Sequence, residues 1–116
     1  MTKRGGVVLV DFPFTSGSQS KIRPALVVQN DISNRRLNKT IVALITGNLR
    51  AAAEPTNFLI DPSTPEHASS GLHAKSLAAC TNLYTIDQVS VVRTIGRLDS
   101  AVLVRIDSCL RAALGI

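Results

Sequence analysis

An arginine and a threonine, each next to an apolar run, are the side chains that best suit chemistry on a phosphate. Arg23 stands directly before Pro24 and the apolar run 25–28, and Thr46 ends the apolar run 40–46. A guanidinium is a planar, permanently charged fork that fits phosphate oxygens. If the two strand ends adjoin, Arg23 could neutralise charge developing on phosphorus while Thr46 donates a hydrogen bond to a phosphoryl oxygen. RNA would bring its own nucleophile, the 2′-OH, so neither a metal nor an activated serine would be required.

Both residues also have an ordinary structural explanation. Many arginines beside a core strand only solvate the strand's end, and threonine is a β-former that is common at strand ends. Proline has a fixed φ and no N–H, so it stands at a strand's first residue or on an edge, and it extends the residue before it. We therefore expect Arg23 to be held at the mouth of a buried strand, whether or not it binds a ligand.

Other kinds of catalytic site find little support. The sequence has no HExxH, no paired cysteine motif and no Gly-rich phosphate loop. His67 and His73 flank a Ser/Gly turn in which nothing nearby would orient or desolvate either ring. Cys80 and Cys109 read as small buried residues of a reducing cytoplasm. With three Phe and one Tyr in the chain, a base-stacking platform is not expected. We expect neither a metal nor a cofactor.

Composition and charge are those of one small globular domain with an anionic partner. The 116 residues are 45% hydrophobic and 18% charged, which predicts a single domain over residues 1–116. No apolar run is long enough for a membrane span or a signal peptide. Residues 1–58 carry eight Lys/Arg against three acids, and residues 59–116 carry five of each. The excess of positive charge in the first half suggests a polyanionic or acidic partner, although solubility alone would explain it as well.

The remaining pattern predicts a mainly β (α+β) fold. Polar, Gly/Ser-rich residues 15–20 read as a hairpin loop, residues 32–38 as a surface turn, and Gly96 as a bulge inside the last strand. Asp99 or Ser100 caps a helix that runs to Leu114, with 103, 106, 110, 113 and 114 on its apolar face. The expected strands are 7–12, 24–29, 40–46, 58–60, 75–82 and 89–98, with a helical turn at 85–88. Five or six strands and one C-terminal helix suggest an SH3-like small barrel, or strongly bent antiparallel sheet, with the helix packed on it.

Read in order, these segments resemble the MazF/PemK family, the toxins of bacterial toxin–antitoxin pairs. The resemblance runs from about Lys3 to Gly115 through RGGVVLVDFPF, KIRPALVVQND, TIVALITGN, SGLHAKSLAACTNLYTID and RTIGRLD. It implies an SH3-like barrel that forms a homodimer and cleaves single-stranded RNA without metal, leaving a 2′,3′-cyclic phosphate and a 5′-hydroxyl. The family's catalytic arginine falls on Arg23 and its catalytic Thr/Ser falls on Thr46, the pair reached above from the residues alone.

The resemblance also points to residues that would contact RNA. The segment from Phe14 to Ile22 corresponds to the family's mobile loop over the RNA groove. Where many members carry Glu-Gln-x-Arg, this chain has Thr81-Asn82-Leu83-Tyr84, so the cleavage sequence cannot be carried over. The candidates for RNA binding are Phe14, Ser18, Lys21, Asn48, Thr81 and Asn82.

Two other functions fit parts of this pattern. A related barrel poisons DNA gyrase by protein binding without catalysis, with its decisive residues in the C-terminal helix, and it does not need an Arg/Thr pair. A small RNA-binding module without activity fits the charge asymmetry but does not require Thr46. The intact pair of Arg23 and Thr46 favours the nuclease. Its expected partners are single-stranded RNA, a second copy of the chain, and a cognate antitoxin whose acidic or amphipathic segment covers the basic groove. The expected location of the protein is the cytoplasm.

Overall fold

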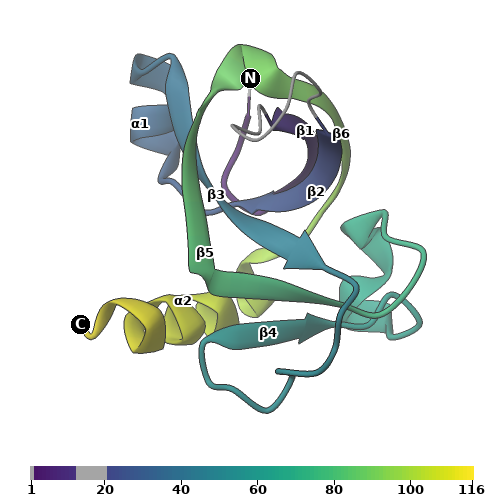
Figure 1. The fold of residues 1–116 in the computed structure, drawn as a ribbon. Helices are drawn as coiled ribbons and strands as arrows, with labels where there is room; N and C mark the ends of the chain where they lie inside the picture. Colours follow the sequence, from purple (N-terminus) through teal and green to yellow (C-terminus); the bar gives the residue numbers. More distant parts are fainter. Residues whose placement is uncertain (1, 13–20) are drawn as a thin grey trace.

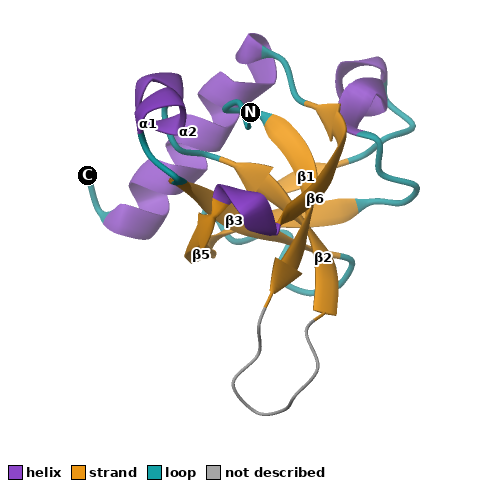
Figure 2. Ribbon diagram, turned by 90° about the horizontal axis from the view of Figure 1, so that it is seen from above, coloured by secondary structure: helices purple, strands orange, loops and turns teal. Residues whose placement is uncertain are grey.

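A six-stranded antiparallel sheet and a C-terminal helix make up most of the computed structural model, which describes residues 2–12 and 21–116. In Figure 1 the strands β1, β2 and β6 curl at one end, and β4 lies with α2 at the other. The long strands β3 and β5 connect the two ends (Figures 1 and 2). The elements are β1 (Gly6–Phe12), β2 (Lys21–Val27), α1 (Asp31–Arg36), β3 (Lys39–Thr46), β4 (Asn57–Ile60), η1 (Pro65–Ser70), β5 (Ser76–Asp87), η2 (Gln88–Ser90), β6 (Val91–Arg97) and α2 (Ser100–Leu114).

The strand order is β4-β5-β3-β2-β1-β6, and every neighbouring pair is antiparallel. The predicted class, a strongly bent antiparallel sheet with a C-terminal helix, is confirmed. None of the helices in the described ranges is long and apolar enough to cross a membrane.

The two faces of the bent sheet carry separate apolar clusters. We call the first the barrel core; it consists of Val8, Val10, Phe12, Ala25, Val27, Val42 and Ile86. We call the second the helix-side core; it consists of Val7, Leu26, Ile45, Phe58, Ile60, Ala78, Cys80, Leu98, Val102, Ile106 and Cys109. Successive residues of one strand enter different cores, because side chains alternate between the faces of a strand. A residue's place in this alternation therefore tells which face its side chain occupies.

The helix α2 has the predicted ends. The carboxylate of Asp99 accepts the N–H of Val102 at 3.0 Å, and Gly115 ends the helix in the left-handed region at φ 72°. Most of the predicted apolar face packs on the helix-side core, since Ile106 belongs to that core and Leu103, Leu110 and Ala113 pack against it. Val102 and Cys109 are buried beside them, and Leu114, also predicted for this face, is exposed.

The segment predicted to be a surface turn is a short helix, α1. Its Asn30 cap accepts the N–H of Ser33 at 2.8 Å. The side chain of Asn34 is buried within it and is fully hydrogen-bonded: its amide donates to the carbonyl oxygen of Gln29 at 3.0 Å, and its oxygen accepts from the hydroxyl of Thr40 at 2.6 Å. This buried polar network, and not an apolar stripe, anchors α1 to β3.

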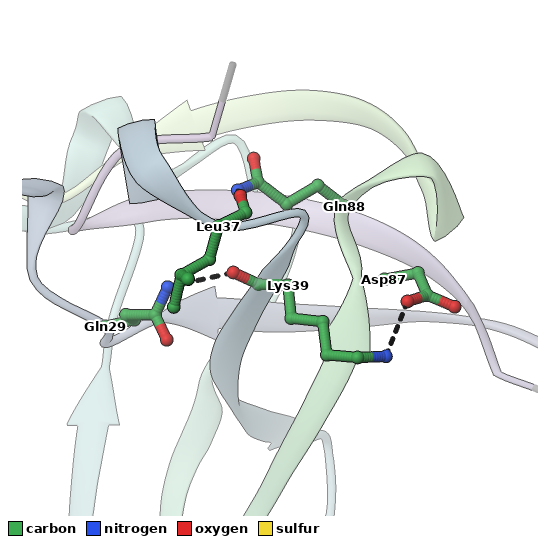
Figure 3. Close-up of polar contacts among 5 residues, drawn as sticks. All are labelled: Gln29, Leu37, Lys39, Asp87 and Gln88. Atoms are coloured by element: carbon green, nitrogen blue, oxygen red, sulfur yellow. Dashed lines mark hydrogen bonds and ion pairs between the residues drawn. The ribbon is translucent and has the colours of Figure 1, made fainter. Parts of the chain in front are cut away.

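Hydrogen bonds and one ion pair join the end of α1 to β3 and β5 (Figure 3). The side-chain amide of Gln88 donates to the carbonyl oxygen of Leu37 at 2.9 Å. The side-chain amide of Gln29 donates to the carbonyl oxygen of Lys39, also at 2.9 Å. Lys39 and Asp87 form an exposed ion pair at 2.7 Å. The Lys39–Asp87 pair links the start of β3 to the end of β5, whose residues 85–87 the sequence analysis had assigned to a helical turn.

Several strand boundaries differ from prediction, most of all in β2, in β5 and in β6, which begins at Val91 after η2 and not at residue 89. The strand β2 begins at Lys21 and not at Pro24, so Pro24 lies inside the strand, opposite Leu9 of β1. Its pairing with β3 begins at Ala25, directly after the residue that has no N–H to donate. The strand β5 runs from Ser76 through Asp87 as one element of 12 residues.

The predicted irregularity at Gly96 is present. Gly96 pairs with Val7 and Thr94 with Val8, which leaves one extra residue in β6 between them. The backbone of η1 passes so close that a Cβ on Gly96 would lie 2.3 Å from the carbonyl oxygen of Ser69. Glycine at this position therefore lets η1 pack directly on β6.

Candidate active site

The register of β2 and β3, continued past its last pair, would align the two predicted catalytic residues. Ala25 lies opposite Leu44 and Val27 opposite Val42, and two more residues in the same register would set Arg23 opposite Thr46. Directly opposite residues of antiparallel strands share a face, with Cβ atoms about 4.5–5.5 Å apart. A guanidinium and a hydroxyl that start from such positions can reach the same phosphate.

Both residues lie on the face that carries the barrel core. Arg23 lies two positions before Ala25, and Thr46 lies four positions after Val42. Residues an even number of positions apart on a strand share a face, and both Ala25 and Val42 belong to that core. Arg23 is exposed and Thr46 is half-buried. The apolar strands therefore supply a fixed base, and the polar groups stand where the core meets solvent.

Local hydrogen bonds orient Thr46 and Asn48. The side-chain oxygen of Thr46 accepts the N–H of Asn48 at 3.1 Å. The side-chain oxygen of Asn48 accepts the N–H of Arg50 at 3.0 Å. Both bonds use oxygen lone pairs, so the hydroxyl hydrogen of Thr46 and the amide hydrogens of Asn48 can still be donated to a ligand. The turn after β3 thus presents two neutral donors at the end of the strand.

Lys21 on β2, and Thr81 and Asn82 on β5, are the other predicted residues near these strands. Lys21 is exposed, lies opposite Phe12 of β1, and precedes Arg23 by two positions on the same face of β2. On β5, Leu83 pairs with Ala43 while Ala79 pairs with Leu44, so residues 80–82 form an interruption in the β3 ladder. Its exposed members are Thr81 and Asn82. Four of the predicted RNA-contacting residues, Lys21, Asn48, Thr81 and Asn82, are thus exposed on or next to the strands that carry the pair. Phe14 and Ser18 lie outside the described residues.

The sequence analysis missed one feature of this face. Tyr84 follows the interruption of β5 and is exposed, and its ring makes an edge contact with Phe12, with centroids 5.3 Å apart. The signal for it was present, since Tyr84 belongs to the segment that departs from the family pattern. Its assignment to the barrel-core face required the pairing of β3 with β5.

Other chemistry-bearing groups lie on the helix-side face. His67 is buried, its ring contacts Phe58, and its Nδ1 accepts the N–H of Asp61 at 2.9 Å. The prediction that nothing orients or desolvates His67 was therefore wrong. Phe58 belongs to the helix-side core, so this histidine is on the face opposite Arg23 and Thr46.

The cysteines are buried and free. Burial raises the pKa of Cys80 to about 12 and also raises that of Cys109. Neither thiol therefore supplies a thiolate nucleophile at neutral pH. Within residues 2–12 and 21–116, no group of three or more His, Cys, Asp and Glu side chains is placed to hold a metal ion.

Comparisons with known proteins agree with this architecture. Residues 3–114 match the model of the PemK-like, MazF-like toxin of type II toxin-antitoxin systems. The chain is 32% identical over 117 residues to Endoribonuclease EndoA of Bacillus subtilis, covering all of this chain and 97% of the relative.

Solved structures show the same fold. One is an endoribonuclease in complex with its cognate antitoxin from a mycobacterial species, with a TM-score of 0.78 and 22% identity, covering 100% of this chain and 97% of that one. Another is the Mycobacterium tuberculosis toxin MazF-mt6, with a TM-score of 0.77 and 22% identity, covering 96% and 97%. The match over nearly the whole sequence, together with the shared fold, shows that the chain belongs to the PemK-like, MazF-like toxin family of type II toxin–antitoxin systems.

Proposed function

We propose that this protein is a toxin endoribonuclease that cleaves single-stranded RNA at a phosphate held between Arg23 and Thr46. Family membership and the 32% identity to an endoribonuclease support the activity. The observation that carries the choice of residues is the β2–β3 register, which sets Arg23 opposite Thr46 when it is continued by two residues. The first half of the chain, where the excess of positive charge lies, contains both strands.

In the proposed reaction the 2′-oxygen of the substrate attacks the adjacent phosphorus and the bond from phosphorus to the 5′-oxygen breaks. The 2′-OH loses a proton and the departing 5′-oxygen gains one, so the products are a 2′,3′-cyclic phosphate and a 5′-hydroxyl. The guanidinium of Arg23 stabilises the negative charge that grows on the phosphoryl oxygens, and the hydroxyl of Thr46 donates a hydrogen bond to one of them. Neither role calls for a metal ion.

The proposal also assigns substrate contacts and partners. Lys21 would bind a neighbouring phosphate, and Asn48, Thr81 and Asn82 would contact bases; the exposure of all four side chains supports these roles. Phe14 and Ser18 remain predicted contacts. A cognate antitoxin, such as the one bound by the mycobacterial relative, would block RNA access. Exposed apolar side chains, including Ile22 and Val92, support a homodimer. Because the proposed substrate is mRNA, we place the protein in the cytoplasm.

The test uses the purified protein with unstructured RNA in EDTA. Wild type should release fragments ending in 2′,3′-cyclic phosphate and 5′-hydroxyl, and Arg23→Ala should reduce the rate by roughly 100- to 1000-fold, the usual effect of removing a group that stabilises transition-state charge. Arg111→Ala removes an equal charge from the exposed surface of α2 and should leave the rate unchanged.

Intact RNA after incubation with wild type, on several unrelated transcripts, would exclude the nuclease. A DNA gyrase supercoiling assay would then examine the protein-binding alternative, in which substitutions in α2 and not in β2 should matter. Cleavage that disappears in EDTA would instead contradict the metal-free reaction.

A further inference from the structure

Tyr84 stands on the same face as the proposed catalytic pair. It lies opposite Val42 on β3, and Val42 is separated from Thr46 by two alternating positions of one strand. Its ring contacts Phe12, a member of the barrel core, which confirms that it faces the inside of the barrel. Phe12 lies directly opposite Lys21 and diagonally opposite Arg23. Diagonal neighbours on paired strands have Cα atoms about 7–8 Å apart.

The ring is anchored on one side and open on the other. Tyr84 is 42% exposed, whereas Phe12 beneath it is 5% exposed. The remaining aromatic ring of the described residues, that of Phe58, is 6% exposed and belongs to the other face. Among the Phe, Tyr and Trp side chains of residues 2–12 and 21–116, Tyr84 is therefore the one that can offer a ring to a ligand. Its contact with Phe12 limits the motion of the ring, so little conformational entropy is lost on binding.

We propose that Tyr84 is the base-stacking residue of this enzyme and holds the nucleobase next to the scissile phosphate. The inference rests on the proposed function and adds to it a specific contact. A base stacked on Tyr84 would place its own ribose and phosphate toward Arg23 and Thr46. The three-residue interruption of β5 sets the ring at the border of the barrel core, where the ladder with β3 resumes. The composition argument against a stacking platform fails here because one correctly placed ring is sufficient.

A purely structural explanation makes a different prediction. If Tyr84 only covered the barrel core, its replacement by another apolar side chain would alter stability and leave RNA recognition unchanged. Stacking on an aromatic ring contributes a factor of roughly 5 to 150 per base, depends on the presence of both ring and base, and tolerates exchange of one aromatic ring for another. These properties separate the two explanations.

The experiment is a double-mutant cycle between protein and RNA. First the cleavage site of wild type is mapped on a short RNA, and then each flanking nucleotide is replaced in turn by an abasic ribose that keeps its 2′-OH. We expect Tyr84→Leu to lower kcat/KM on intact RNA by roughly 5- to 150-fold. At one flanking position, the abasic RNA should lower the wild-type value by a similar factor, and the combination should lower it no further. Tyr84→Phe and Tyr84→Trp should remain within about threefold of wild type.

A binding measurement accompanies the kinetics. The same RNA carries 2-aminopurine at that position and a 2′-deoxy sugar at the cleaved nucleotide, so that it binds without being cut. Wild type and Arg23→Ala should quench the 2-aminopurine fluorescence, and Tyr84→Leu should not. Thr85→Ala, the exposed next residue whose side chain alternates to the other face, should behave as wild type.

Two results would overturn the role of Tyr84 and leave the nuclease intact. One is that the reductions in kcat/KM caused by Tyr84→Leu and by the abasic nucleotide are independent, and so multiply, at every position. The other is that Tyr84→Leu quenches the 2-aminopurine fluorescence as much as wild type does. If Tyr84→Leu fails to fold, Tyr84→Phe and Tyr84→Trp still test the proposal, because loss of activity in both of these variants would also contradict stacking. Absence of cleavage by wild type would instead refute the proposed function itself.

Discussion

The side-chain oxygen of Thr46 accepts the main-chain N–H of Asn48 at 3.1 Å. The hydroxyl that we propose binds the scissile phosphate therefore also holds the turn that follows β3. Because the hydroxyl has both roles, we expect activity to depend more on whether the residue at position 46 keeps a hydroxyl than on the size of its side chain.

Replacing Thr46 by Val keeps the shape and removes both uses of the hydroxyl. We expect kcat to fall by roughly 100-fold or more, as for loss of one donor to a developing oxyanion. Thr46→Ser retains the hydroxyl and should stay within about tenfold of wild type, the order of one neutral hydrogen bond. Steady-state cleavage of one RNA by the three proteins measures this, and equal activity of the Val and wild-type proteins would exclude Thr46 from the chemistry.

Replacing Arg23 by Lys keeps the charge and removes the planar fork. Since a guanidinium can hold two phosphoryl oxygens at once and an ammonium is a point charge, kcat/KM should fall by at least about tenfold. The slope of log Kd against log salt for uncleavable RNA should stay the same, because the number of neutralised phosphates is unchanged. If Lys gave full activity, only the charge at this position would matter.

Replacing Gly96 by Ala should destabilise the fold. The new Cβ would lie 2.3 Å from backbone atoms of Ser69 and Ser70, which cannot move aside as a flexible side chain can. We expect a loss of about 3 kcal/mol in the free energy of unfolding, at the upper end for overpacking. Gly47→Ala is the control, because no atom lies within 4 Å of its added methyl group. Chemical denaturation of both variants provides the comparison, and a Gly96→Ala midpoint equal to wild type would contradict the packing of η1 on β6.

The buried thiols should resist alkylation in the native protein. With a pKa of about 12, Cys80 holds roughly a thousandfold less thiolate at pH 8 than an ordinary cysteine. Iodoacetamide should therefore label Cys80 and Cys109 only after unfolding. The same shift affects stability: because the folded pKa lies above the ordinary thiol value of 9.0, the contribution of Cys80 to stability is complete below pH 9 and is lost as the pH rises from 9 toward 12. Rapid labelling at pH 8 without unfolding would contradict this burial.

Asp31 should contribute to stability at neutral pH and not in acid. The N–H of Arg4 donates to its carboxylate at 2.7 Å, and this bond is the largest cause that lowers the pKa of Asp31 below its ordinary value of 3.8. Stability from a lowered pKa is present above the unfolded value and is lost as the pH falls through the folded value. Asp31→Asn should cost about 0.5–1 kcal/mol at pH 7, since the group is screened by solvent. The difference in unfolding free energy should shrink as the pH falls below 3.8 and Asp31 becomes protonated in the folded protein, and a difference that stays constant would point to a cause other than charge.

The strands and the final helix were predictable because their signals are local. Apolar runs bounded by Gly, Pro and Asn marked β1, β3 and β4, and Asp99 with Gly115 marked the ends of α2. The helix α1 was not predictable in this way. Its six residues are mostly polar, and its stability depends on bonds from Asn34 to Gln29 and Thr40, which become neighbours only in the folded chain.

The residues of the candidate site could be proposed from the sequence, and their relative placement could not. Residue type alone singled out Arg23 and Thr46, and the resemblance to a family selected the same two. Their alignment depends on the register of β2 with β3, which is a non-local property that hydrophobic periodicity does not specify. For the same reason Tyr84 could not be assigned to this face before the pairing of β5 was known.

The interruption of β5 has a consequence for how this fold can diversify. Residues 77–79 and 83–87 pair with β3 in two different registers, and between them Thr81 and Asn82 take no part in that ladder. Exchanging these two exposed side chains leaves both halves of the pairing intact. A randomised library at these positions should therefore yield folded proteins at high frequency, and among them variants with altered RNA preference, because selectivity and foldability are encoded by different residues of one strand.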